Sequence, residues 1–495
     1  MATILGSSMA FIDGTVVNVT LPALQAGLNA TVVDVQWVIE AYSLLLTAFL
    51  LLGGSLGDRY GRRRIFLFGV TLFALASVWC GFASSIRQLI LARALQGLGG
   101  AFLVPGSLAI ISSSFGQKER GKAIGTWSGF TAITAAIGPV IGGWLIEHSS
   151  WRAVFFINVP IAFFVLVISW WRVPETRDSS ATAGLDVWGA ALITIALGSL
   201  VYGLIESSRL GFSHPAVLTT LLGGSVLLVI FFIFETRIQN PMLPLALFHS
   251  RNFSGANLLT LLLYGALGGT LFFFPLNLIQ VQGYTPTAAG ASLLPFILII
   301  FVLSPWAGGL VHRFGAKLPL VVGPMIASVG FALFMIPDVG GSYWRTFFPA
   351  TVVLGLGMAT SVAPLTTTVM NAVAETRVGI ASGINNAVSR AAGLLAIAAL
   401  GIVMLHTFNR SLERRVSVMG LPTEVQRSID SQRVNMAGAK LPEEIPPTTQ
   451  NLLRQAIDES FVRGFRRVML IGAVLALTSA LSAWVLIDGK QEATD

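Results

Sequence analysis

The chain consists of long runs of apolar residues, separated by shorter segments that hold most of its charges. Of its 495 residues, 54% are hydrophobic and 11% are charged, whereas soluble domains usually carry about 25% charged residues. A run of about 20 apolar residues is long enough to cross a bilayer as a helix. Because backbone polar groups in lipid must be satisfied within the segment, repeated runs of this kind predict an all-α, polytopic membrane protein.

Fourteen runs of suitable length can be distinguished, which predicts fourteen transmembrane helices. They lie at about 1–24, 36–57, 65–83, 88–111, 121–146, 152–171, 186–205, 216–235, 254–279, 288–311, 318–337, 346–369, 378–407 and 465–487. The first run lacks the basic start of a secretory signal and contains Asp13 and Pro22, so we expect it to be retained as a span. The charged segment 409–463 should form a long extracytoplasmic loop.

The distribution of basic residues predicts the orientation, because short cytoplasmic loops collect lysine and arginine. If both termini are cytoplasmic, the inner segments hold Arg59, Arg62, Arg63, Arg64, Lys118, Arg120, Lys122, Arg172, Arg177, Arg237, Arg251, Arg313, Lys317, Arg377 and Lys490. The short outer loops hold only Arg87, Arg152, Arg209 and Arg345. This asymmetry supports cytoplasmic termini and an even number of spans.

A charged hairpin, Gly54-Ser-Leu-Gly-Asp-Arg-Tyr-Gly-Arg-Arg-Arg64, joins the second and third runs. Glycine permits a tight backbone turn, and the arginines suit a cytoplasmic loop. The pattern resembles the signature loop of the major facilitator superfamily of secondary transporters. This resemblance implies two helical bundles that rock about a central site, with an inner latch that forms when the transporter faces outward. The latch residues would be Gly54, Asp58, Arg59, Gly61 and Arg62.

Parts of the sequence repeat at a constant offset. The segment 308–317 follows the pattern of 54–63, with His312 in place of Asp58, and Ser382-Gly383 matches Ser128-Gly129. Transporter folds are commonly built from such repeats. We therefore predict two pseudo-symmetric six-helix bundles with two additional helices between them. The predicted domains are 1–175, the additional helices and linkers at 176–249, and 250–495 with its long outer loop.

Asp13 lies inside the first run, in Ile12-Asp-Gly-Thr-Val-Val-Asn-Val-Thr-Leu-Pro22. An aspartate at the centre of a span costs about 2.5–3.5 kcal/mol on insertion scales, so such residues usually have a function. The segment resembles the first-helix motif of the fourteen-helix drug:proton antiporters, although Thr20 is a mild departure. We expect Asp13 to bind and release the coupling proton; a structural aspartate at a kink is the alternative.

Glu40 and Arg93 are charged residues inside the second and fourth runs. The segment beginning at Arg93 resembles a superfamily motif whose arginine is associated with proton transfer. Because arginine keeps its own proton, it would act by tuning an acid, either Glu40 or Asp13. Glu40 could instead bind a cationic substrate or reach water at the membrane interface, and Arg93 could belong to a purely structural ion pair.

Further polar residues are expected to line a substrate cavity. Arg390 lies eleven residues after Gly379, which is about 16 Å along a helix and therefore near mid-membrane. Bracing between helices is the alternative for this arginine. The complete set of cavity candidates is Asn18, Asn257, Asn277, Gln280, Asn385, Asn386 and Arg390.

The fifth run is rich in glycine and contains one proline. It resembles the helix motif associated with antiporters of the superfamily, at Gly125, Gly129, Gly138, Pro139, Gly142 and Gly143. Glycines four residues apart allow two helices to approach closely, and proline bends the helix. We expect this helix to seal one side of the cavity against leak.

These features together predict a proton-coupled antiporter that exports small amphipathic or cationic compounds from the cytoplasm, with the inner or plasma membrane as its location. The expected partners are a small-molecule substrate, protons and the lipid bilayer, with the protein as a monomer. An exporter or flippase of one metabolite or lipid is the alternative within transport, and a non-transporting receptor or scaffold is the alternative of another class. Enzymatic activity, metals, cofactors and nucleic-acid binding are not expected.

Overall fold

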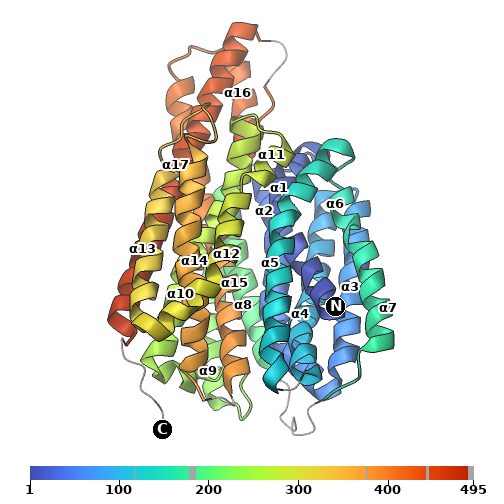
Figure 1. The fold of residues 1–495 in the computed structure, drawn as a ribbon. Helices are drawn as coiled ribbons and strands as arrows, with labels where there is room; N and C mark the ends of the chain where they lie inside the picture. Colours follow the sequence, from blue (N-terminus) through green and yellow to red (C-terminus); the bar gives the residue numbers. More distant parts are fainter. Residues whose placement is uncertain (116, 178–185, 375–376, 442–444, 489–495) are drawn as a thin grey trace.

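The computed structural model describes residues 1–115, 117–177, 186–374, 377–441 and 445–488. Within these ranges it also leaves aside the side chains of 117–122, 124, 128, 132 and 312. The described chain is almost entirely helical and contains no strand (Figure 1). The fold is therefore all-α, as the sequence predicts.

Two groups of helices form the body of the protein. The first comprises α1 (Ala2–Leu28), α2 (Val32–Tyr60), α3 (Arg62–Phe82), α4 (Ile86–Ser114), α5 (Gln117–His148), α6 (Ala153–Phe156) and α7 (Asn158–Arg172). The second comprises η1 (Leu245–His249), α10 (Arg251–Leu276), η2 (Asn277–Val281), α11 (Pro286–Ala291), α12 (Leu294–Phe314), α13 (Lys317–Leu333), α14 (Phe347–Asn371), α15 (Val378–Val416), α16 (Thr423–Gln432), η4 (Arg433–Gly438) and α17 (Pro447–Leu486). We call these the N-terminal and C-terminal halves.

The number of membrane spans agrees with the sequence-based prediction. In the described residues, 13 helical stretches are long and apolar enough to cross a membrane, and α13 is a further apolar helix of 17 residues. Two of the stretches join short helices across a break, α6 with α7 and α11 with α12. The chain is thus a multi-pass membrane protein with fourteen spans.

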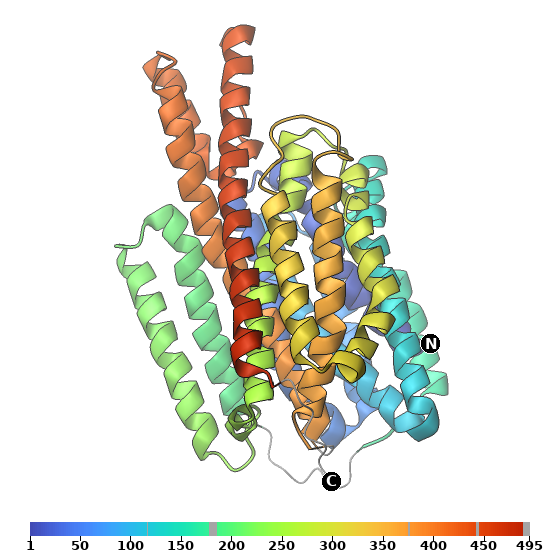
Figure 2. The same ribbon diagram turned by 60° about the vertical axis from the view of Figure 1, so that its left-hand side comes forward.

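The two additional helices, α8 (Val187–Leu210) and α9 (Pro215–Arg237), form a hairpin beside the bundles (Figure 2). Helix α8 packs against α2 of one half and α15 of the other. At one end of the hairpin, Asp186 accepts hydrogen bonds from the Gly189 amide of α8 and from the Met242 amide, which follows α9, so that the start of α8 is tied to the segment after α9. The hairpin therefore covers one side of the contact between the halves.

The tight turn between α2 and α3 depends on Gly61. Its φ is +116°, a backbone conformation that side chains disfavour. A Cβ here would lie 2.7 Å from a carboxylate oxygen of Glu175. That carboxylate accepts hydrogen bonds from the backbone amides of Arg63 and Arg64, at 3.0 and 3.2 Å. The glycine thus leaves room for the acid that binds the start of α3.

The substitution Gly61→Ala is expected to lower the free energy of unfolding by about 1–3 kcal/mol, since it adds backbone strain and displaces Glu175. Thermal unfolding in detergent measures the effect. The matched control is Gly57→Ala, because the nearest atom to a Cβ at Gly57 is 3.9 Å away. Equal destabilisation by the two substitutions would contradict this account of the turn.

The segment predicted as a long outer loop is largely helical. Helix α15 extends to Val416, and α17 begins at Pro447. Both continue well above the other helices and carry α16 between them (Figures 1 and 2). The charged residues that the sequence places outside the membrane therefore lie mainly on the ends of α15 and α17 and on the short helices α16 and η4 between them.

Candidate functional site

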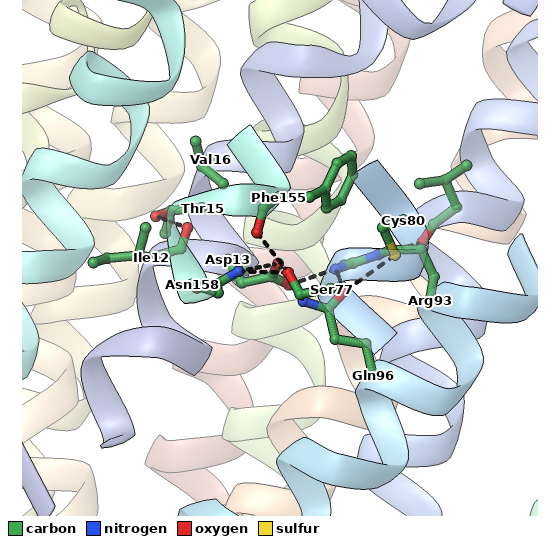
Figure 3. A network of polar contacts seen from close by, with 12 residues as sticks. Ile12, Asp13, Thr15, Val16, Ser77, Cys80, Arg93, Gln96, Phe155 and Asn158 are labelled. Atoms are coloured by element: carbon green, nitrogen blue, oxygen red, sulfur yellow. Dashed lines mark hydrogen bonds and ion pairs between the residues drawn. The ribbon is translucent and has the colours of Figure 1, made fainter. Parts of the chain in front are cut away.

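A network of buried polar side chains surrounds Asp13 in the N-terminal half (Figure 3). The Arg93 guanidinium forms an ion pair with one carboxylate oxygen of Asp13, at 2.5 Å. Gln96 donates a hydrogen bond to the other oxygen, at 2.8 Å, and accepts one from Arg93, at 2.7 Å. Asn158 donates to the same carboxylate at 3.4 Å and to Ser77 at 3.0 Å. The network joins α1, α3, α4 and α7.

The ion pair is removed from solvent, with 1% of the Arg93 side chain and none of Asp13 exposed. Burying two charges is stabilising only if further hydrogen bonds satisfy them. Arg93 has such bonds, because its Nε donates to the Val38 carbonyl at 3.2 Å and its guanidinium lies 4.2 Å from the centre of the Tyr42 ring. The sequence left two possible partners for Arg93, Asp13 and Glu40. The structure pairs Arg93 with Asp13.

The sequence analysis missed Gln96, Asn158, Ser77 and Tyr42. Gln96 could have been found, because it is three residues after Arg93 and residues at that spacing share a helix face. Asn158 and Ser77 offer no such signal, since their helices come next to α1 only in the folded chain. Tyr42 looks like an ordinary residue of an apolar helix until the structure places it against Arg93.

Substituting leucine for Gln96 is expected to destabilise the protein by about 1–3 kcal/mol, since Asp13 and Arg93 each lose a hydrogen bond inside the core. A thermal unfolding series in detergent tests this. Gln455→Leu is the control, because Gln455 is exposed and bonds only to the neighbouring Glu459. An unfolding midpoint that stays at the native value in the Gln96 variant would contradict the role given to this amide.

Glu40 is fully buried, and neither of its carboxylate oxygens has a hydrogen-bond partner in the described residues. It lies one helical turn after Gln36, whose amide donates to the Ile397 carbonyl of α15. Residues four apart share a helix face, so Glu40 lies on the face of α2 that meets the C-terminal half. The alternative that Glu40 is an interfacial acid that reaches water is therefore wrong for this structure, because its side chain is fully buried.

Arg390 comes from α15 and is half-buried. Its Nε has no hydrogen-bond partner among the described residues. Arg390 is therefore a partly buried cation of the C-terminal half with an unsatisfied donor.

The amide side chains predicted for the cavity are mostly used in contacts between or within helices. Asn385 donates to Asn257 at 3.2 Å and to Thr260 at 2.7 Å, which links α15 to α10. The remaining contacts are Asn277 accepting from Gln282, Gln280 donating to Gln25, Asn18 donating to the Gly14 carbonyl and Asn386 donating to the Ser382 carbonyl. Of these amides, Asn386 is exposed and bonds only within its own helix.

The glycine-rich motif of α5 packs closely in the C-terminal part of the helix. Cβ atoms at Gly138 and Gly142 would lie 2.4 and 2.1 Å from side-chain atoms of Thr15 and Val16 in α1. The expectation of close contact is wrong for Gly125 and Gly129 in this structure. Among the described residues outside the same stretch of α5, no atom lies within 4 Å of a Cβ at Gly125, and only Phe301, at 3.8 Å, lies near one at Gly129.

The C-terminal part of helix α5 also meets the C-terminal half of the protein. A Cβ at Gly143 would lie 2.4 Å from the Pro286 carbonyl oxygen, and one at Gly290 would lie 2.2 Å from the Pro139 carbonyl oxygen. Glu147 accepts a hydrogen bond from the Thr287 amide, at 2.7 Å. We call this contact between α5 and α11 the outer seam, because the charge pattern of the sequence predicts that this end faces outward. It leaves no room for side chains between the two backbones.

Residues 3–397 match the family model of the Major Facilitator Superfamily. The chain belongs to this superfamily. It is 33% identical to the multidrug resistance protein Stp of Mycobacterium tuberculosis and 32% identical to the tetracenomycin C resistance and export protein of Streptomyces glaucescens. Each alignment covers 98% of this chain and 90% of the relative.

Solved structures of the superfamily have the same fold. One is a bacterial homologue of the human lysosomal transporter Spinster, in an inward-facing and unoccupied conformation, with a TM-score of 0.72. It is 17% identical, and the match covers 100% of this chain and 98% of that one. The inward-open xylose transporter XylE of E. coli follows with a TM-score of 0.60 and 13% identity, over 100% and 96% of the two chains. The chain therefore has the fold of these transporters. Its membership of the Major Facilitator Superfamily makes it a transporter of small molecules.

The signature loop of the superfamily makes its contacts inside the N-terminal half. Asp58 forms an ion pair with Arg62 at 2.8 Å, and the Arg63 guanidinium donates to the Val173 carbonyl at 3.1 Å. No ion pair between Asp58 or Arg59 and the C-terminal half occurs in the described residues. The predicted latch across the halves is not formed here, and the side chain of its counterpart, His312, lies outside the described part.

The part of the chain that the structure describes holds no group of three or more His, Cys, Asp or Glu side chains that could bind a metal ion. Lys490 and the side chains of Lys118, Arg120 and Lys122, which the charge pattern placed inside, lie outside the described residues. The candidate site thus consists of the Asp13 network, Glu40 and Arg390, which lie on both sides of the contact between the halves.

Proposed function

We propose that the protein is a proton-coupled antiporter that exports small amphipathic or cationic compounds. The buried Asp13–Arg93 ion pair carries this proposal, since an ionisable pair inside a membrane protein usually marks a proton or substrate pathway. The printed names of the relatives, which include a multidrug resistance protein and an export protein, support drug efflux.

Protonation of Asp13 would change the contacts of α1. The neutral carboxyl loses its ion pair with Arg93, and with it part of what binds α1 to α4. The same helix packs against Gly138 and Gly142 of α5, and its Gln25 accepts a hydrogen bond from Gln280 of the C-terminal half. A proton at Asp13 can therefore shift the balance between two arrangements of the halves, provided that it binds one of them better.

Glu40 gives the site a second acid with a different role. Its carboxyl has no cationic partner in the described residues and lies on the face of α2 that meets α15. A positively charged substrate would supply the missing partner, whereas a proton would neutralise the acid and weaken substrate binding. Proton entry is favoured by the membrane potential, at about 2.3 kcal/mol per charge for 100 mV.

The orientation and assembly complete the proposal. The concentration of arginine in the predicted inner loops supports an orientation with both termini in the cytoplasm, in the plasma or inner membrane. Two halves that together enclose one site require no second chain. We therefore propose a monomer as the transporting unit.

Transport by the purified chain in liposomes tests the function. A pH gradient is imposed and the movement of the cationic dye ethidium is followed. Dye should move against the proton flow, and collapse of the gradient with nigericin should stop it. Unchanged dye movement after nigericin would contradict proton coupling, and no movement of ethidium or of a panel of amphipathic cations would contradict drug export.

A further inference from the structure

A basic groove lies between the upper parts of α15 and α17, where both helices rise above the rest of the molecule (Figure 2). It has a volume of about 570 Å³. Its ionisable lining residues are His406, Arg410 and Arg414 of α15 and Arg463 and Arg467 of α17. We call it the outer arginine groove. The groove lies apart from the Asp13 network, since its residues belong to other helices.

The arginines of the groove form two facing rows. His406, Arg410 and Arg414 are four residues apart, as are Arg463 and Arg467, so each set lies on one helix face. All five side chains are exposed. None of them has an ion pair or hydrogen bond with another described residue.

Neighbouring arginines of the same segment behave differently. Arg415 pairs with Glu459, and Arg466 pairs with Asp338 at 3.4 Å. The fold therefore supplies acids to the arginines around the groove and none to those inside it. The groove concentrates four positive charges without a counter-charge from the described chain.

The position of the groove relative to the membrane follows from α17. Below Arg467 the same helix face continues as Leu470, Val474, Leu477, Leu481 and Trp484, spaced alternately by three and four residues. These five side chains are 36–62% exposed. Such a stripe faces lipid.

The length of this stripe places the groove at a membrane surface. From Arg467 to Trp484 the helix rises about 25 Å at 1.5 Å per residue, which is close to the roughly 30 Å thickness of a hydrocarbon core. The two rows of arginine therefore lie at the level of the lipid headgroups, at the end of the bundle opposite the C-terminus (Figure 1).

Arginine suits one class of ligand at this level. Its planar guanidinium donates paired hydrogen bonds to the oxygens of a phosphate group. A phospholipid seated in the groove would have its phosphate between α15 and α17 and its acyl chains along the apolar stripe of α17. A free phosphate would satisfy the charge but not the stripe.

We propose that the outer arginine groove binds the headgroup of an anionic phospholipid from the outer leaflet. The lipid bridges α15 and α17, and thereby holds together the two long helices that carry the outer segment. This inference rests on the topology of the protein and is independent of the proposed proton coupling.

Thermal unfolding of the delipidated chain in detergent tests the proposal with three probes. Dioleoyl phosphatidylglycerol should raise the unfolding midpoint by at least about 3 °C, because a ligand that binds the folded state stabilises it. Dioleoyl phosphatidylcholine, with no net charge, and inorganic phosphate at the same concentration should each give less than half of this shift.

A triple variant, R410Q/R463Q/R467Q, identifies the site. It should lose most of the rise in unfolding midpoint that phosphatidylglycerol causes. The control variant R87Q/R345Q/R427Q should keep this rise. It removes three exposed arginines outside the groove, whose side chains form no ion pair or hydrogen bond with the described residues. If the triple variant does not fold, the single variants R410Q and R467Q should each weaken the lipid effect.

The results separate the sources of the phosphate. A shift with phosphatidylglycerol that is lost only in the groove variants supports the proposal. Equal shifts with the two lipids, an equal shift with inorganic phosphate, or a lipid effect that survives R410Q/R463Q/R467Q would each overturn it.

Discussion

The substitution Asp13→Asn is expected to abolish dye transport driven by a pH gradient while leaving a folded protein. Asparagine has nearly the same shape as aspartate but cannot bind or release a proton in the working range. Arg93 would then be a buried charge without a counter-ion. Breaking a buried ion pair in this way lowers the free energy of unfolding by about 3–5 kcal/mol. The measurements are gradient-driven ethidium movement in liposomes and thermal unfolding in detergent.

Two further variants separate coupling from stability. The double variant Asp13→Asn with Arg93→Gln should be more stable than Asp13→Asn alone, because it removes the unpaired charge, yet it should remain inactive. Asp338→Asn is the control, since this carboxylate is 72% exposed and surface ion pairs contribute little. Gradient-driven transport at the native rate in Asp13→Asn would refute its role as the coupling residue.

Leucine in place of Gly143 is expected to keep the outer seam from closing. A Cβ at this position would already lie within 2.5 Å of backbone atoms of Pro286 and Thr287. Overpacking of this kind costs about 1–3 kcal/mol, and a cost of that size shifts the balance between two arrangements by about 5–150-fold. Because the seam must open and close in each cycle, transport should fall by a similar factor.

Spin labels on the outer loops of the two halves report the arrangement directly. The pair Ser149→Cys and Val339→Cys, in a background with Cys80→Ala, should give longer distances in electron–electron double resonance when Gly143→Leu is added. Gly290→Leu should act in the same way from the other side of the seam. Gly125→Leu is the matched control, since no described atom of another helix lies within 4 Å of its Cβ position. Equal distances with and without Gly143→Leu would contradict the seam.

The sequence predicted the fold well because the bilayer limits what an apolar run can do. A segment such as 216–235 has few alternatives to a membrane-spanning helix, so length and apolarity suffice to recognise it. The same approach found Asp13 and Arg93, since an ionisable side chain inside such a run stands out. It was less successful with Asn257 and Gln280, because an amide in a span can serve a substrate, another helix or its own backbone.

The sequence alone thus determined the number of spans, the superfamily and the charged residues inside the membrane, because each of these can be recognised within one continuous segment. The tertiary structure alone decided that Arg93 pairs with Asp13, that Glu40 is left without a partner, and that Gly143 meets the Pro286 backbone. The physical reason is that these contacts join helices far apart along the chain. Which side chains become neighbours depends on how the helices pack, and no local pattern records that packing.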